Sequence, residues 1–264
     1  MRILRLLTVC VVLTLPLWGA PGVAEDISSL IEQGNAAWEK RGTDGNPENR
    51  RAADCFLSAV QAAPFSYEAH WKAARSLWWL ADQGLLATDD KGRQRDLGRQ
   101  GMDLAGRAVL ISPDSAEGHL YWALSALHHC YGIGMVDALK KGIPDEAARH
   151  LWICYEKDRT AEDGRVLLGL SAFFRTAPWP IRDKDKSVAY AREAVSVDPV
   201  GVRTSVFLAA ALAAAGSHAE SMELMKTAAE MDGDKAREPD SKLWTRFARR
   251  CVDEGRVIDP EKLF

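Results

Sequence analysis

Residues 202–232 read VRTSVFLAAALAAAGSHAESMELMKTAAEMD, and this stretch decides the fold. Its first half is rich in alanine and leucine, which are strong helix formers, and it lacks the alternation of apolar and polar residues that marks a strand. Gly216 interrupts the pattern, and Ser221, Met225 and Ala228 then follow at steps that share one face of a second helix. The stretch predicts a helical hairpin whose small residues allow close packing.

The spacing in the second helix of this hairpin recurs along the chain. Steps of four, three and five residues lead from Ser221 to Gly233, and three earlier stretches have the same steps with proline in the last place. These stretches are Ala52-Phe56-Ala59-Pro64, Gly101-Ala105-Ala108-Pro113 and Ser187-Ala191-Ala194-Pro199. The closing proline stops each helix because it cannot continue the hydrogen-bond ladder. Four copies predict an all-α protein, built as a degenerate array of helical hairpins (an α-solenoid) rather than one compact globule.

The same patterns predict about eleven helices with a capping helix at the C-terminal end. They are expected at 27–40, 47–62, 67–83, 94–111, 116–131, 144–158, 161–175, 184–197, 202–215, 218–231 and 240–254. A short extra helix is expected at 135–141, and 84–92 is expected to be a loop. Arginines on a polar face of 240–254 suit a helix that closes a repeat array.

The first 24 residues have the pattern of a secretory signal peptide. Arg2 and Arg5 precede an apolar run that is too short to span a bilayer, and Gly22-Val23-Ala24 supplies small residues before a cleavage site. We therefore expect a periplasmic protein with one helical-repeat domain over 25–264. An uncleaved N-terminal anchor is the alternative. Cys10 makes a poor lipid-anchor site, because the bulky Val9 precedes it.

The net charge of the chain bears on the class of partner that it can bind. Loss of the leader changes the formal net charge from −3 to −5, which gives no support for nucleic acid as a partner.

Four cysteines remain after loss of the leader, namely Cys55, Cys130, Cys154 and Cys251. An exported protein can form disulfides, and four cysteines allow three pairings. One disulfide and four buried thiols are both compatible with the pattern.

The order of small, bulky, small and proline residues resembles that of tetratricopeptide-type repeats. The last hairpin matches best, with Leu208, Ala209 and Leu212 on its first helix and Gly216 at its turn. Leu168-Gly169 supplies the leucine-glycine pair of another first helix. The resemblance covers most of 25–232 and implies a binding scaffold whose first helices line a concave surface or a central pore.

A narrower resemblance is to the T-component family of tripartite ATP-independent periplasmic (TRAP) transporters. The matching segments are His119-Leu120-Tyr121-Trp122-Ala123, 132–139, and Ala177-Pro178-Trp179-Pro180 followed by Asp183-Lys184-Asp185-Lys186-Ser187. Arg182 stands where the family pattern has a glycine. The resemblance implies an exported accessory protein that docks a periplasmic substrate-binding protein during solute uptake.

Aromatic residues are the main candidates for a ligand site. Trp78, Trp79 and Trp122 lie on helices expected to face the inside of the array, where they can form one apolar pocket. Filling of gaps between hairpins is the alternative role. His119 and Tyr131, on the same expected helix as Trp122, complete this part of the candidate ligand-binding set.

The proline-rich loop supplies the remaining candidates. Trp179 lies between two prolines, which restrict its backbone, so it can cover a cavity or dock a partner, or else plug a gap between hairpins. Arg175 and Arg182 flank it and would pair with a carboxylate ligand.

No arrangement of residues points to catalysis. Phosphate-binding glycine loops, nucleophile elbows and zinc-protease motifs are absent from the sequence. His128, His129 and Cys130 point in different directions on a helix, so they cannot share a metal. We therefore expect no enzyme activity, no metal and no cofactor.

Two functions remain. The first is an accessory protein of a TRAP-type uptake system that docks a substrate-binding protein and holds a small organic ligand. The alternative is a generic periplasmic scaffold for envelope protein assembly without a small ligand. A closed cavity lined by Trp78 and Trp122 would favour the first, and an open groove the second. A homo-oligomer is compatible with both.

Overall fold

The computed structural model describes residues 26–88, 90–177, 179–232 and 239–257. Within these ranges it contains twelve helices and no strand. They are α1 (Ile27–Glu39), α2 (Pro47–Ala62), α3 (Tyr67–Thr88), α4 (Lys91–Ile111), α5 (Ala116–Ile133), α6 (Met135–Lys140), α7 (Ile143–Lys157), α8 (Ala161–Thr176), α9 (Lys184–Val197), α10 (Val202–Ala215), α11 (His218–Glu230) and α12 (Ser241–Asp253). None of the described helices is long and apolar enough to cross a membrane.

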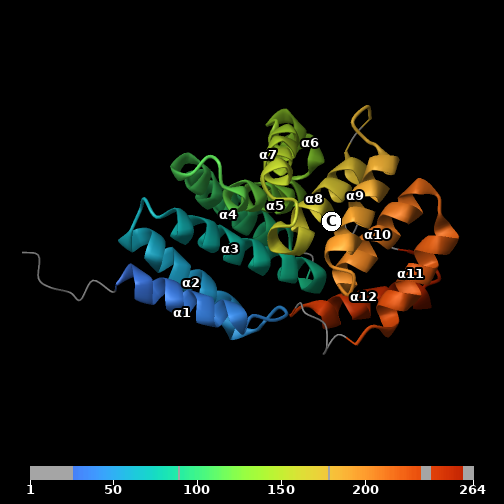
Figure 1. Cartoon of the computed structure of the whole chain (residues 1–264), viewed down its shortest axis with the longest axis horizontal. Coiled ribbons are helices and arrows are strands. Elements are labelled where there is room, and N and C mark those ends of the chain that lie inside the picture. Colours follow the sequence, from blue (N-terminus) through green and yellow to red (C-terminus); the bar gives the residue numbers. More distant parts are fainter. Residues whose placement is uncertain (1–25, 89, 178, 233–238, 258–264) are drawn as a thin grey trace, which may run out of the picture.

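The helices form successive antiparallel hairpins, α1–α2, α3–α4, α5–α7, α8–α9 and α10–α11. Figure 1 shows them following one another as a curved array, from blue to orange, with the red α12 turned back under α10. The short α6 is an insertion between the two helices of the middle hairpin. The α-solenoid predicted from the repeat spacing is therefore confirmed.

The repeated small and bulky residues account for the packing within each hairpin. In each of the four copies of the repeated spacing, the first three residues lie on one helix face, and all twelve of these residues are buried. The copies lie on the second helices of their hairpins, α2, α4, α9 and α11. Ser187 Oγ donates to the Ser171 carbonyl across 2.8 Å, and Ser221 Oγ donates to the Ala209 carbonyl across 2.5 Å. A small residue in the first position lets the second helix reach the backbone of the first.

One expected loop is largely helical in the structure, and one helix end is shifted. The expected loop 84–92 is wrong, because α3 continues to Thr88 and α4 begins at Lys91. Asp90 caps α4 by accepting from the Arg93 backbone N–H across 3.0 Å, which satisfies one of the unpaired donors of the first turn. The helix expected at 116–131 continues through Gly132 and ends before Gly134, and Gly132 lies against the backbone of Arg95 on α4. A Cβ at Gly132 would meet the Arg95 backbone nitrogen at 2.4 Å, so this glycine permits close helix contact.

The array curls until its C-terminal part meets its N-terminal half. Gln83 on α3 donates through Nε2 to Asp240 Oδ2 across 3.2 Å, although the two residues are 157 positions apart. Arg203 on α10 forms ion pairs with Asp82 on α3, at 2.8 Å, and with Asp240. These contacts join α3, α10 and the start of α12. They hold the two parts of the curved array together and give it an inner side.

Candidate functional site: a cavity on the inner side of the array

A cavity of about 310 Å³ lies on the inner side of the curved array. Most of its wall comes from the first helices of successive hairpins, α3, α5, α8 and α10, with α12 closing one side. The lining residues are Trp78, Asp82, Lys91, Leu124, Leu127, His128, Cys130, Tyr131, Gly134, Met135, Arg165, Leu168, Gly169, Ala172, Thr176, Arg203, Phe207 and Trp244. Its size is that of a small-molecule site.

Trp78 is the aromatic residue around which the charged part of the wall is arranged. Its side chain is buried on α3, and two guanidinium groups lie near its ring. The Arg165 guanidinium carbon is 4.9 Å from the ring centroid, and that of Arg203 is 5.8 Å away. Both distances are within the range of cation–π attraction, which stabilises charges held away from bulk water.

Arg203 belongs to a buried ionic network. Its Nη2 atom donates to Asp82 Oδ2 and to Asp240 Oδ2. The indole N–H of Trp244 also donates to Asp240 Oδ2, across 2.8 Å. These opposite charges and hydrogen bonds lower the pKa of the Asp240 carboxyl, although burial acts in the opposite direction. Asp240 is therefore ionised and holds α12 against α10 and α3.

His128 is a neutral member of the cavity wall. Burial lowers the pKa of its imidazole to about 4, because the charged form would lose its hydration there. Asp82 opposes this shift and Arg203 adds to it. His128 Nε2 lies 4.0 Å from Asp82 Oδ1. At neutral pH the imidazole therefore supplies hydrogen-bonding capacity without a charge.

A second ionic layer lies along α1, α3 and the start of α8. The guanidinium groups of Arg41 and Arg75 lie 4.1 Å and 4.0 Å from the ring centroid of Trp38, and Arg75 pairs with Glu162 across 3.3 Å. Glu162 begins a left-handed run through Gly164, so the regular part of α8 starts at Arg165 rather than at 161 as expected. Left-handed backbone costs free energy at a glutamate, whereas Gly164 adopts it without a Cβ penalty.

The described cysteines and histidines form no metal site. No disulfide links Cys55, Cys130, Cys154 or Cys251 in the part of the chain that the structure describes. Within the same part, no group of three or more metal-ligating side chains comes together. Burial raises the pKa of the Cys130 thiol to about 11 and that of Cys154 to about 12, so both are protonated at neutral pH.

Comparison with known proteins agrees with this architecture. No family model matches the sequence, and no curated protein matches it. Among solved structures, a thermophilic tetratricopeptide-repeat (TPR) protein from Thermus thermophilus is similar, with a TM-score of 0.61 and 14% sequence identity. The match covers 85% of this chain and 99% of that protein. The fold is a TPR-like helical solenoid.

Two of the eight candidate site residues line the cavity of the solenoid. Trp78 and Tyr131 are part of its wall, and the Nζ atom of Lys91 lies 5.4 Å from the Tyr131 ring centroid. Arg175 is buried nearby, with its guanidinium carbon 5.8 Å from the ring of Phe207, a wall residue. It is not itself among the lining residues.

Three other candidates are packed between helices of the solenoid, Trp79 between two hairpins and the other two within the α5–α7 hairpin. Trp79 is fully buried, packs against Trp38, and donates from its indole N–H to the Gly42 carbonyl across 3.1 Å. Trp122 stacks on His150 with a centroid distance of 4.4 Å. His119 is bonded to the same His150 through their Nδ1 atoms, 2.7 Å apart. Trp122 is thus separated from the cavity that Trp78 lines.

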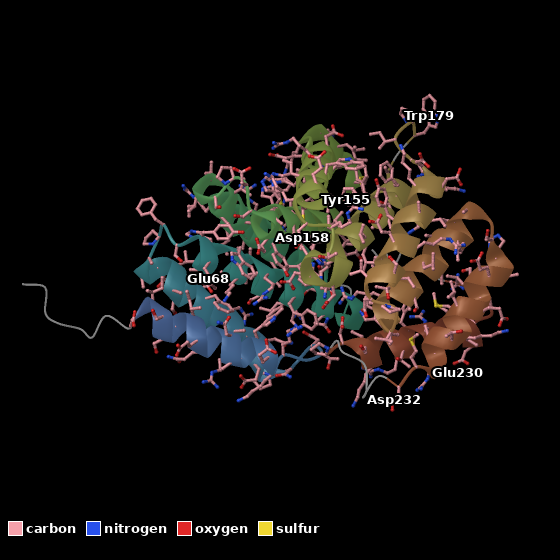
Figure 2. The ribbon with its side chains drawn as sticks, viewed as in Figure 1. Glu68, Tyr155, Asp158, Trp179, Glu230 and Asp232 are labelled. Atoms are coloured by element: carbon pink, nitrogen blue, oxygen red, sulfur yellow. The ribbon has the colours of Figure 1, made fainter. Side chains whose placement is uncertain are left out.

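The loop candidates lie on the outer surface. Trp179 is 88% exposed and projects from the tip of the loop between α8 and α9 (Figure 2). Arg182 is exposed, and its Nε–H donates to the Ala177 carbonyl across 2.9 Å. The arginines that the sequence placed beside a carboxylate ligand therefore do not line the cavity, whereas Arg165 and Arg203 do.

Sequence reasoning missed the charged wall residues Asp82, Arg165 and Arg203. For Arg165 and Arg203, the spacing of residues along the helix could have predicted a position on the inner face. Arg165 precedes Leu168, Gly169 and Ala172 at steps of three and four, and Arg203 precedes Phe207 by four, so each arginine lies on the inner face of its helix. An arginine on an apolar face is informative, because such a charge is rarely buried without a partner.

Proposed function

We propose that this protein is a helical-repeat binding protein that docks another protein and holds a small organic ligand in its inner cavity. The observation that carries the proposal is the cavity of about 310 Å³, lined mainly by residues of α3, α5, α8, α10 and α12. A repeat array that only docked proteins would need no internal cavity with buried charged residues in its wall, because burying charge costs free energy. The cavity supports a small-ligand role over that of a scaffold without a ligand site, with Trp78 but not Trp122 in its wall.

The specific form of the proposal is an exported accessory protein of a TRAP-type uptake system. The supporting features are the apolar N-terminal segment, the segment around Trp122 and the loop that carries Trp179. In that system the protein would dock a periplasmic substrate-binding protein.

The outer surface near the loop suits such docking. Trp179 and Ile181 are exposed, as are Met135, Val136 and Leu139 on α6. A small apolar groove brings Met135, Leu139 and Ile181 together. It shares Met135 with the wall of the cavity. Exposed apolar residues gathered in this way are typical of protein-binding surfaces.

The test is a pull-down of the tagged protein from the periplasm of its own organism, with mass spectrometry of proteins and small molecules. We expect recovery of a solute-binding protein, with its loss in the Trp179→Ala variant. Phe65→Ala is the matched control, since Phe65 is an equally exposed aromatic residue in the turn between α2 and α3. The intact mass of the recovered protein also tests cleavage after residue 24.

Other outcomes would contradict the proposal. Recovery of envelope-assembly proteins alone, with no small molecule, would favour the scaffold alternative. Equal loss of binding in Trp179→Ala and Phe65→Ala would show that the α8–α9 loop has no special part in docking. Recovery of the protein from the cytoplasm alone, with its first 24 residues intact, would exclude export.

A further inference from the structure

We propose that α6 is a hinged lid between the inner cavity and the small apolar groove on the outer surface, and that the Met135 side chain blocks the opening between them. This inference rests on the proposed function, because a lid has a role only if the cavity takes up a ligand. It states how access to that site is controlled.

The inner cavity and the outer groove share part of their walls. Both are lined by Leu127 and Cys130 on α5, by Met135 at the start of α6 and by Thr176 at the end of α8. The groove has a volume of about 50 Å³, which is too small for an organic ligand. A displacement of the shared wall would join the groove to the cavity of about 310 Å³ and so open a passage from the outer surface.

Met135 is the member of the shared wall that can move aside. Leu127 and Cys130 belong to α5, which packs against both α4 and α7. Thr176 is held by its hydroxyl, which donates to the Ala172 carbonyl across 3.0 Å. Met135, in contrast, is 48% exposed, and a methionine side chain has three rotatable bonds. The wall between the cavity and the groove is therefore weakest at Met135.

The whole of α6 is held lightly against the rest of the molecule. Of its six residues only Ala138 is buried, whereas Val136 and Leu139 are exposed. Among the described residues, the one ion pair of this helix joins Lys140 to Asp137 across 3.6 Å, and both residues belong to α6. This pair therefore does not fix the helix to its neighbours. A segment with few buried apolar contacts opens at a low cost in free energy.

A glycine at each end of α6 supplies a hinge. Gly134 precedes the helix with φ 86°, and Gly142 follows it with φ 69°. A Cβ at either position would meet no atom within 4 Å beyond its neighbours in the chain. Glycine is therefore required at both places by the backbone conformation and not by close packing. Two such positions on either side of a lightly held helix can absorb the backbone change that a hinge motion needs.

The rate at which iodoacetamide alkylates Cys130 in the full chain measures the opening of α6. Cys130 lies in the shared wall, and burial raises the pKa of its thiol to about 11, so it reacts slowly while it is covered. Cys154 is fully buried and lines neither the cavity nor the groove, so it reports unfolding of the domain. Peptide-resolved mass spectrometry follows both thiols. We expect urea below the unfolding transition to raise the Cys154 rate and leave the Cys130 rate unchanged, because the opening of a short lid exposes little surface.

Substitutions at the hinges separate a lid from a fixed wall. Gly134→Ala and Gly142→Ala strain the closed position of α6, so each should raise the Cys130 rate by at least about threefold, the lower end of the penalty for left-handed backbone. Gly45→Ala is the matched control, since Gly45 has φ 85° in the turn between α1 and α2 and its Cβ would also meet open space. That variant should leave the Cys130 rate unchanged.

A second pair of variants tests the blocking side chain. Met135→Ala removes most of the side chain that lies in both walls, so it should raise the Cys130 rate by at least about threefold, since local opening then costs less. Val136→Ala is the matched control, because Val136 is exposed on the same helix and lines neither the cavity nor the groove. It should leave the rate unchanged.

Three results would overturn the lid. Equal acceleration of Cys130 and Cys154 by urea would mean that Cys130 is reached only by unfolding. Unchanged Cys130 rates in the glycine variants would show that the reagent enters through a cavity with a fixed wall, and Gly142→Ala alone decides this if Gly134→Ala does not fold. Equal rates in Met135→Ala and Val136→Ala would show that Met135 blocks nothing. Because alkylation needs no ligand, the lid can fail while the pull-down still recovers a small molecule, and the reverse also holds.

Discussion

At the scale of single residues, a pair of histidines buried between α5 and α7 links folding to pH. His119 Nε2–H donates to the Pro113 carbonyl across 2.9 Å, so its Nδ1 atom must accept from the Nδ1–H of His150, 2.7 Å away. A proton on His119 Nδ1 would place one N–H against another, whereas the Nε2 atom of His150 lies 4.0 Å from Glu146 Oε1. Burial, together with the charge of His119, lowers the pKa of His150 to about 3.

This pair and His128 predict loss of stability in mild acid. Because the folded-state pKa values, about 3 for His150 and about 4 for His128, lie below the ordinary value of 6.5, the unfolded chain takes up protons first. The contribution of these two neutral histidines to the unfolding free energy is fully present above pH 6.5 and declines as the pH falls toward 4. Each histidine accounts for about 1.4 kcal/mol per pH unit in that window.

Urea unfolding between pH 7.5 and 4.5 measures this dependence. His150→Gln removes one titrating group and should reduce the slope of unfolding free energy against pH by about one proton. His218→Gln is the control, since His218 is exposed at the start of α11 and should leave the slope unchanged. A slope that is identical in all three proteins would show that His150 remains able to protonate in the folded state.

At the scale of helices, the contact between α4 and α5 depends on glycine. A Cβ at Gly98 would meet the His129 backbone nitrogen at 2.5 Å and the Ser125 carbonyl oxygen at 2.7 Å. Both atoms belong to the backbone of α5, which cannot yield as a flexible side chain can. The two helices would have to move apart.

The prediction is that Gly98→Ala lowers the unfolding free energy by about 1–3 kcal/mol, the usual cost of overpacking. Gly106→Ala is the matched control on the same helix, where a Cβ would meet only Trp122 ring atoms at 3.7 Å. That variant should be neutral or gain up to about 1 kcal/mol from better helix propensity. Denaturant unfolding of the two variants checks the contrast, and equal effects would mean that α4 and α5 can separate at little cost.

At the scale of the whole molecule, the buried ionic network closes the solenoid. Asp240 is fully buried and joins α12 to Arg203 on α10 and Gln83 on α3. Removing one partner of a buried ion pair leaves the other charge uncompensated, so Asp240→Asn should lower the unfolding free energy by about 3–5 kcal/mol. Asp114→Asn, in the exposed pair with Lys157, should change it by less than about 1 kcal/mol.

Closure can be measured separately from stability. Hydrogen exchange of the C-terminal end of α3 should accelerate in Asp240→Asn, because α12 no longer holds it. A double-mutant cycle with Arg203→Gln should give a coupling energy of at least about 1 kcal/mol. Additive effects of the two substitutions would indicate that shape complementarity, rather than this ion pair, closes the array.

Local sequence determined the helical hairpins of this protein. Helix-face spacing and the closing prolines depend on interactions within about five residues, and these are written in the chain itself. The positions of Ala52, Ala105, Ala191 and Met225 could therefore be predicted as buried. The predicted end of α5 at 131 came two residues early because a glycine that turns a chain and one that admits a neighbouring helix look alike in sequence.

Only the tertiary structure decided where the cavity lies and which side chains reach it. Small rotations from one hairpin to the next accumulate along a solenoid, and no local pattern fixes their sum. That sum brings Arg203 to Asp82 across 121 positions and leaves Trp122 outside the wall that Trp78 lines. The amphipathic pattern of each helix specified an inner face, and the curvature of the whole array decided which inner faces meet.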